Sequence, residues 1–390
     1  MKRGNTMLNK KLVAGFTVLT FSALVLGACS PDKKDDSAAS SSAKTEQTTA
    51  SSSKAANADV KIADGKTENA EVPGAGTIVM RQLYTAPHGD KSFAVVNVTL
   101  DGDKIISARM DEFQYVEKGD DWTGVPNSDG KLGENFPKGN ILVAKEENSK
   151  AYSAMMKDHG GATQTWDASM TAITNFVKGK TVAEVEKAVK DLEAQGKDAK
   201  VADVVSGATF ADTKGYLQSI VDAAKSGMVS VGEKTSNTDL KEAMILAAPH
   251  GDQSFATVTV ALDGDKVAAT FVDEFQYVDP ADFGGVPNSN AAFGEGIKDN
   301  LVLGSKYANN EAYSAMMKDH AKATQTWEEN IHAVDAFAKG KTVAELEKAV
   351  SDLKGQGEDG KVSDVVSGAT FADTAGYLQG IIDAAKKAAE

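Results

Sequence analysis

The chain has 390 residues, of which 41% are hydrophobic, and a formal net charge of −14. This length allows two or three globular domains, the composition excludes a bundle of membrane helices, and the acidic balance makes nucleic acid an unsuitable partner. A single cysteine excludes iron–sulfur clusters held by four cysteines, C-x-x-C-H haem attachment and a thiol redox pair.

Residues 1–28 have the pattern of a secretory signal peptide. Four basic side chains and no acidic one accompany an apolar run over 12–26, which is short for a bilayer-spanning helix and is followed by small residues. The alternative is an ordinary buried helix, but no polar stripe interrupts the apolar run. The segment therefore predicts export of the rest of the chain.

Residues 26–29, "LGAC", resemble a bacterial lipobox. The resemblance implies cleavage before Cys29, attachment of a diacylglyceryl group to its sulfur, and a lipid anchor on the extracellular face of the membrane of a Gram-positive bacterium. As the only cysteine, Cys29 has no intrachain disulfide partner. The tail "FSALVLGA", 21–28, resembles hydrophobic peptide pheromones released from lipoprotein signals, with simple disposal of the fragment as the alternative.

Residues 29–72 are rich in Ser, Ala, Thr, Lys and Asp and contain almost no large apolar side chain. Such a segment buries too little apolar surface to offset its chain entropy, so we expect a disordered, lipid-anchored tether. About 40 flexible residues have a root-mean-square reach of roughly 35 Å.

The remainder is a tandem duplication with an offset of 162 residues that becomes 161 after the "DEFQY" stretch. "APHGD" occurs at 86 and 248, "DEFQY" at 111 and 273, "GVPNS" at 124 and 285, and "AYSAMMKDH" at 151 and 312. Units of about 150 residues are the size of whole domains. We therefore expect two homologous domains, 73–226 and 238–390, with a boundary in 226–237.

Each repeat predicts a mixed α+β fold. "SFAVVNVTL", the turn "DGD" and "KIISARM" indicate a β-hairpin, and "TVAEVEKAVKDL" has helical periodicity behind a capping box of Thr181 and Glu184. The segment "KVADVV" at 200–205 is short and β-branched, so we expect a strand. A helix follows it, with one apolar face from Tyr216 to Ala224.

The stretch "DVVSGATFAD" is identical at 203–212 and 364–373. The conservative interpretation is a helix cap, with Thr209 and Asp212 as an N-cap pair. The functional interpretation is a phosphate site, because a threonine before a helix lies near unpaired N–H groups and the positive end of the helix dipole. Gly207 and Ala208 leave room beside the backbone for a bulky group.

The two stretches resemble the D-x-x-S-G-A-T flavinylation motif of FMN-binding domains, such as that of the C subunit of sodium-pumping NADH:quinone reductase. The resemblance implies FMN in phosphoester linkage to the last threonine, Thr209 or Thr370, transferred by a magnesium-dependent flavin transferase. It also implies that the other motif residues serve transferase recognition and the phosphate cradle, namely Asp203, Ser206, Gly207 and Ala208, and Asp364, Ser367, Gly368 and Ala369.

Lipobox, tether and two such domains together resemble two-flavin lipoproteins of extracellular electron transfer. The resemblance implies electrons from a membrane NADH dehydrogenase and quinone, delivery to ferric iron or another acceptor, and no catalytic residue or metal site in the protein. One alternative is a ligand-binding or adhesin lipoprotein without a redox cofactor. The other is an enzyme with Ser206 and Ser367 as nucleophiles, although the chain lacks G-x-S-x-G.

Several repeated residues leave two interpretations open. His88 and His250, like His159 and His320, suit turn or helix-end positions or contacts to a flavin, and a metal site would need more ligands at close spacing. The methionine pairs at 155–156 and 316–317, with Trp166 and Trp327, suit the core or a cofactor wall. "GVPNS" suits a rigid loop beside the cofactor or a plain turn.

Overall fold

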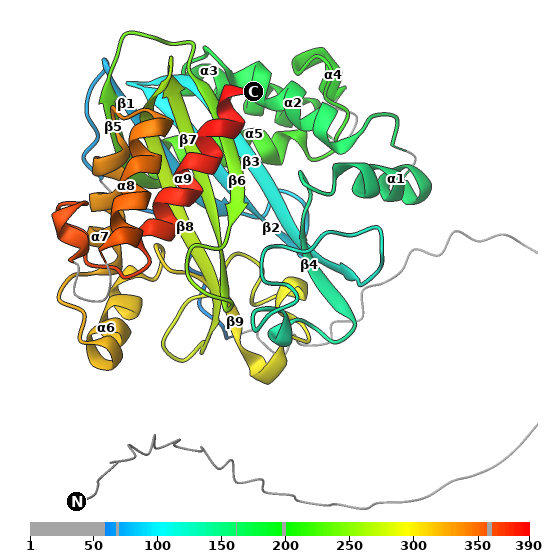
Figure 1. Cartoon of the computed structure of the whole chain (residues 1–390). Coiled ribbons are helices and arrows are strands. Elements are labelled where there is room, and N and C mark those ends of the chain that lie inside the picture. The colour runs from blue at the N-terminus through cyan, green and yellow to red at the C-terminus, as the bar shows by residue number, and fades with distance from the viewer. Residues whose placement is uncertain (1–58, 68–69, 161, 197–199, 357–360) are drawn as a thin grey trace, which may run out of the picture. The chain divides into compact units, whose positions relative to one another are not determined.

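The computed structural model describes residues 59–67, 70–160, 162–196, 200–356 and 361–390 (Figure 1). The predicted signal peptide, the lipidation site Cys29 and the tether up to residue 58 lie outside this range. The described residues belong to one compact unit, and their helices and antiparallel sheets confirm the mixed α+β class. No helix among them is long and apolar enough to cross a membrane.

The first repeat forms a five-stranded antiparallel sheet with the order β4-β3-β2-β1-β5. Its strands are β1 (Thr77–Thr85), β2 (Ser92–Asp101), β3 (Lys104–Glu117), β4 (Asn140–Ala144) and β5 (Met228–Lys234). The predicted hairpin is confirmed, because Asp101 pairs with Lys104 across a two-residue turn in which Gly102 has a φ of 61°.

The second repeat forms a four-stranded antiparallel sheet with the order β6-β7-β8-β9. Its strands are β6 (Lys241–Ala247), β7 (Ser254–Asp263), β8 (Lys266–Val278) and β9 (Val302–Ser305). Short 3-10 turns lie in the loops of both repeats, namely η1 (Gly133–Asn135), η3 (Ala292–Gly294) and η4 (Lys298–Asn300). β6 is the counterpart of β1, but no described strand covers its outer edge as β5 covers that of β1.

The helices follow the strands in both repeats. They are α1 (Ser149–Gly160), α2 (Trp166–Val177), α3 (Val182–Gln195), α4 (Val201–Val204) and α5 (Thr213–Ser226), then α6 (Asn310–Ala321), α7 (Trp327–Ala338), α8 (Val343–Gly355), η5 (Val362–Asp364) and α9 (Thr374–Ala389). The Thr181–Glu184 capping box and the buried face of α5 are confirmed. The strand expected in "KVADVV" is wrong, since its residues form α4 and, in the second repeat, η5.

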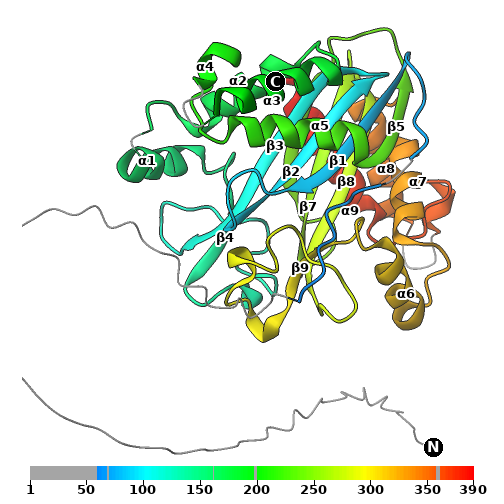
Figure 2. The ribbon, with the colours of Figure 1, turned by 180° about the vertical axis from the view of Figure 1, so that it is seen from behind.

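The two sheets lie face to face, and each has helices on its outer side. α9 covers β6 and β7 and lies in front of the sheets in Figure 1, whereas α5 covers β1 and β2 and lies in front in Figure 2. β1 and β5 contact β8 across the interface. Each sheet is therefore buried on both faces, by its own helices and by the other repeat.

The contacts between the sheets are reciprocal. Phe93 contacts Phe275 with ring centroids 5.9 Å apart, and the counterpart pair Phe255 and Phe113 has centroids 5.6 Å apart. The hydroxyls of the counterparts Tyr115 and Tyr277 hydrogen-bond to each other. Such self-complementary contacts are those of a two-fold interface, here within one chain.

The segment between the repeats forms strand β5 of the first sheet. β5 pairs with β1 and contacts β8, so most of the expected boundary segment 226–237 belongs to the first sheet and touches the second repeat. Asp335 of α7 holds this junction, because its buried carboxyl accepts hydrogen bonds from Ser230 of β5 (3.5 Å) and Thr270 of β8 (2.6 Å). Burial raises the pKa of Asp335 to about 7.

The expected tether is shorter than 29–72. Ile62 forms a parallel bridge with Gly285, and the Tyr84 N–H donates to the Asp64 carbonyl at 2.8 Å. Gly65 is buried with a φ of 80°, and a Cβ there would lie 2.6 Å from Met228. Apolar and small side chains after residue 59 thus give this segment a place in the fold that its polar composition did not indicate.

Truncation of Phe275 to Ala should destabilise both repeats together. Its ring contacts Tyr84, Phe93 and Phe255, so we expect a loss of about 3–5 kcal/mol in the free energy of unfolding. Denaturant titrations followed by the fluorescence of Trp166 and of Trp327 should give coincident midpoints. Val72→Ala, at a half-exposed position, is the control, and separate midpoints for the two repeats would contradict one cooperative unit.

Asp335→Asn should remove a pH dependence of stability. The folded protein retains a proton on Asp335 up to about pH 7, whereas the unfolded chain loses it near 3.8, so the free energy of unfolding should fall as pH rises between these values. The fall attributable to this group is up to about 4 kcal/mol. Thermal unfolding at pH 4–8 measures it, and an unchanged slope in the variant would refute the assignment.

Candidate functional site

Each repeat contains one pocket that includes its motif threonine, and these two pockets are equivalent. They have volumes of about 430 Å³ and 610 Å³, within the range of small-molecule sites. Every residue that lines the first has its repeat counterpart in the second, and all these pairs are identical. In the first repeat they are His88, Lys145, Tyr152, Met156, Ala162, Thr163, Trp166, Thr209, Phe210, Ala211, Asp212 and Tyr216.

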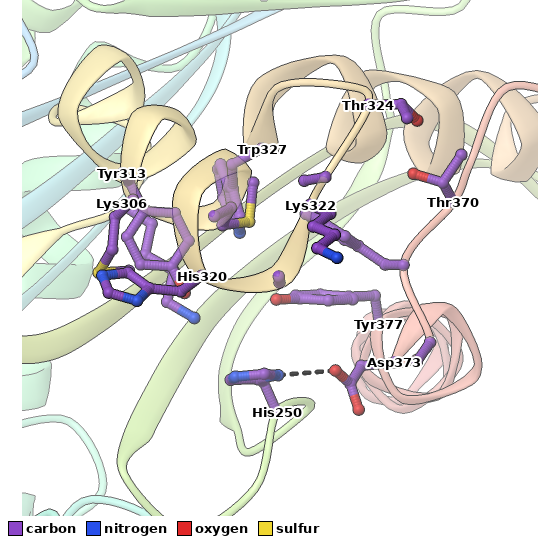
Figure 3. A pocket seen from close by; sticks show the side chains of 16 residues that line it. His250, Lys306, Tyr313, His320, Lys322, Thr324, Trp327, Thr370, Asp373 and Tyr377 are labelled. Atoms are coloured by element: carbon purple, nitrogen blue, oxygen red, sulfur yellow. Dashed lines mark hydrogen bonds and ion pairs between the residues drawn. The ribbon is translucent and has the colours of Figure 1, made fainter.

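The motif threonines lie in the pocket walls. In the second pocket, Thr370 and Thr324 lie at one end and Lys306, Tyr313 and His320 at the other (Figure 3). Thr370 is an exposed residue, as is Thr209. The pocket therefore presents an accessible hydroxyl at one end and aromatic and basic side chains at the other.

The helix-cap interpretation of these threonines is wrong. α5 begins at Thr213, and its N-cap residue Asp212 makes no side-chain cap hydrogen bond. Thr209 lies four residues before the helix, and its hydroxyl is 3.2 Å from that of Ser169 in α2. The counterpart Thr370 donates its N–H and hydroxyl to the Asn330 side chain in α7.

The other motif residues build the turn. Gly207 and Gly368 both have a φ of 88°, a left-handed conformation that favours glycine. Ala208 and Ala369 are fully buried, so their methyl groups anchor the turn in the core. Ser206 and Ser367, and likewise Asp203 and Asp364, are exposed and lie outside the pocket linings.

A histidine–carboxylate pair closes each pocket beside the helix start. His88 Nδ1 lies 2.8 Å from Asp212, and His250 Nδ1 lies 2.7 Å from Asp373 (Figure 3). The hydrogen bond from each histidine lowers the pKa of the aspartate. His320 also lines the second pocket, whereas His159 lies at the end of α1 outside the first pocket lining.

A buried ion pair underlies each pocket. Lys145 Nζ lies 2.8 Å from Glu112, which also accepts a hydrogen bond from the Tyr216 hydroxyl at 2.7 Å, and the same groups recur as Lys306, Glu274 and Tyr377. Burial alone would lower the pKa of Lys145, but the contacts with Glu112 and Tyr152 together outweigh burial and the pKa is raised. Each pocket therefore has a buried lysine whose charge is balanced by the adjacent glutamate.

Tryptophan, tyrosine and methionine supply the apolar lining. Trp166 and Trp327 are buried core residues that also line the pockets, so both interpretations of the tryptophans hold together. Met156 and Met317 line the pockets, whereas Met155 does not line the first. Trp166 Nε1 is buried without a hydrogen-bond partner among the described residues, and a ligand with an acceptor atom would satisfy it.

Each pocket depends on the other repeat through the "GVPNS" loops. Asn288, with a φ of 68°, donates to the carbonyls of Gly89 and Ser92 at 2.8 and 2.7 Å, and the Ser92 hydroxyl donates to the His88 carbonyl. Asn127 makes the reciprocal bonds to Gly251 and Ser254. These loops connect the two repeats and lie outside the linings of the two threonine pockets.

Sequence reasoning missed the lysine and the glutamate beside each pocket, and it assigned Asp212 and Asp373 to helix caps rather than to the histidine pairs. A signal existed for Lys145 and Lys306, since each directly follows the short apolar strand β4 or β9. No such signal joins His88 to Asp212, which are 124 residues apart. Among the residues that the structure describes, no group of three or more His, Cys, Asp or Glu side chains forms a metal site.

Comparison of the chain with protein-family models, with curated proteins and with solved structures gave no match. The pockets must therefore be interpreted from their own chemistry. That chemistry combines a hydroxyl, a positive charge, a histidine–carboxylate pair and flat apolar side chains, and it suits an anionic ligand with an aromatic ring system.

Asn288→Gly should loosen the first pocket, although Asn288 belongs to the second repeat. Glycine retains the left-handed backbone conformation, so the change removes only two hydrogen bonds. We expect the pKa of Asp212 to rise as the His88 contact weakens and that of Asp373 to stay unchanged, measured by carbon-13 NMR of the carboxyl groups. Asn127→Gly is the matched variant with the opposite result, and an effect within the mutated repeat would contradict the crossed contacts.

Proposed function

We propose that this chain is an exported flavoprotein that carries FMN in phosphoester linkage to Thr209 and to Thr370 and relays electrons. The main support for this proposal is one observation. Two pockets, one per repeat, have identical linings at every shared position, and each contains the accessible threonine of a D-x-x-S-G-A-T motif. Two copies of one binding site suit two carriers of the same kind.

The residues of each pocket fit an attached flavin nucleotide. Lys145 supplies positive charge for an anionic group, while Trp166, Tyr152 and Met156 offer apolar faces to a flat ring system. The His88–Asp212 pair holds a proton between its nitrogen and oxygen atoms at the pocket wall. Both volumes, about 430 and 610 Å³, accommodate a ligand of nucleotide size.

FMN accepts two electrons and can release them singly, which suits a relay between a two-electron donor and a one-electron acceptor. The protein's own residues bind, orient and screen the group. The proposal implies three kinds of partner. A flavin transferase attaches FMN, a membrane NADH dehydrogenase and quinone supply electrons, and ferric iron or another extracellular acceptor receives them. The lipid anchor at Cys29 would hold the relay at the cell surface.

Two rivals have weaker support. A serine-nucleophile enzyme would need a general base beside Ser206 and Ser367, and within the described part of the chain neither serine hydrogen-bonds to a histidine or carboxylate. A receptor or adhesin that binds its ligand reversibly would use the same pockets without a covalent bond. Such a receptor would release its ligand on denaturation, whereas a covalently bound FMN would stay attached to the chain.

Intact mass measurement separates these functions. Protein co-expressed with a flavin transferase should exceed the polypeptide mass by two FMN less two waters, because each threonine oxygen–phosphorus bond forms with loss of water overall. Yellow colour should remain with the chain after denaturation and desalting. A colourless chain of unmodified mass under these conditions would overturn the proposal.

Thr209→Val and Thr370→Val should each remove one FMN, and the double change both. Thr163→Val and Thr324→Val are matched controls, since these threonines line the same pockets outside the motif and should leave two FMN in place. Peptide mapping of the flavin to either control threonine would contradict the assignment of the sites.

A further inference from the structure

A separate cavity, of about 530 Å³, lies in a groove between the repeats and apart from the two threonine pockets. Gly124 and Pro126 form one wall, and the half-buried side chains of β6 from Met244 to Leu246 form the other. Asp111, Glu146, Glu147 and Lys387 complete the lining. The groove is thus apolar along the edge strand β6 and carries a net negative charge.

The two-fold counterpart of this groove is filled by residues 61–67 of the chain itself. Ala63 N–H donates to Gly285 O at 2.8 Å, and Gly285 N–H donates to Lys61 O at 2.9 Å. Further along, Tyr84 N–H donates to Asp64 O, and Thr67 N–H donates to Ser226 O at 2.7 Å. An extended peptide therefore occupies that side by main-chain pairing.

The empty groove has the same three attachment points. Gly124, Leu246 and Lys387 are the repeat counterparts of Gly285, Tyr84 and Ser226, and all three line the cavity. Within the described ranges no hydrogen bond reaches Gly124, and no strand covers the outer edge of β6. The backbone sites that residues 61–67 satisfy in one repeat thus remain open in the other.

Asp111 adds to the groove a carboxyl oxygen, Oδ2, that has no hydrogen-bond partner within the described part of the protein. Its side chain is 4% exposed, and only its Oδ1 atom accepts hydrogen bonds, from the N–H groups of Glu112 and Glu146. The counterpart Asp273 also receives hydroxyl hydrogen bonds at Oδ2 from Tyr84 and Ser305.

The repeats differ at both of those donor positions. Leu246 and Ala144 stand where the second site has Tyr84 and Ser305, so Asp111 has no hydroxyl donor. Burial and then the nearby Glu146 raise the pKa of Asp111 well above its ordinary value. A carboxyl oxygen that faces a cavity without a protein partner favours a ligand that brings a donor.

We infer that this groove is a docking site for an extended, basic peptide segment of a partner protein, which pairs its backbone with Gly124 and runs along the edge of β6 toward the end of α9. Strand addition at an open sheet edge supplies affinity through main-chain hydrogen bonds. A lysine or hydroxyl side chain of the segment reaches Asp111, and the acidic lining selects for positive charge.

One difference between the grooves specifies the peptide further. The filled side has Gly284, whose missing Cβ would lie 2.8 Å from the Cβ of Ala63, whereas the empty side has Thr123 at that position. A Cβ at that position would also lie 3.0 Å from the backbone N of Ala63, so Thr123 excludes a side chain on the peptide and requires the peptide backbone to lie a few tenths of an ångström farther away than residues 61–67 do. The segment must therefore have glycine where residues 61–67 have alanine.

The probe is a fluorescent peptide with the sequence of residues 60–67 carrying Ala63→Gly, added to the full chain without a flavin transferase. We expect saturable one-to-one binding by fluorescence anisotropy. Replacing the same position by proline removes the N–H that would donate to Gly124, so affinity should fall about tenfold or more. Exchange of both lysines for glutamate should weaken binding similarly at low salt.

Asp111→Asn in the protein should weaken binding about tenfold, because an amide cannot take the negative charge that a bound basic side chain would stabilise on Asp111, while it keeps the acceptor that fixes the local backbone. Asp273→Asn, at the filled site, is the matched control and should leave binding unchanged. Absence of saturable binding would overturn the inference, as would binding unaffected by proline or by Asp111→Asn. Self-association of the chain that Asp111→Asn abolishes would instead assign the groove to a second copy and also overturn it.

Discussion

The reciprocal packing of two sheets through their phenylalanine faces is the constraint on which the rest of the structure depends. Each sheet has its own helices on one side only, so its other face would expose rings such as Phe93 and Phe113 in a separate repeat. Burying those faces against each other removes them from water and fixes a two-fold relation within the chain. The described parts of the two repeats therefore form one compact unit.

That relation also explains why the sites are coupled. The loops that carry His88 and His250 end at the interface, and the crossed hydrogen bonds of Asn288 and Asn127 fix their carbonyl groups. In a single repeat, the same loop would lose both bonds. A duplicated chain thus gains two complete pockets from contacts that neither half contains.

Sequence reasoning predicted what depends on local chemistry. The hairpin around Gly102 and the Thr181 capping box need only neighbouring residues, and the repeated D-x-x-S-G-A-T motif marked Thr209 and Thr370. Sequence reasoning failed where contacts between residues far apart in the sequence determine the local conformation. "KVADVV" has strand propensity but packs as α4, and Asp212, whose sequence suits a cap, bonds to His88 instead. Residues 61–67 were expected to belong to the tether because their polar composition does not indicate the backbone contacts that they make with Tyr84, Ser226 and Gly285.

The differences between the repeats are as informative as the identities. Every shared pocket-lining position is identical, which is the pattern of two sites under one chemical requirement. The interface positions have diverged, as in Tyr84 against Leu246, Ser305 against Ala144 and Gly284 against Thr123. Those three changes all fall in one pair of related grooves, of which one holds a segment of the chain and the other is open. Duplication thus preserved two equal binding sites while it left a single edge free for another strand.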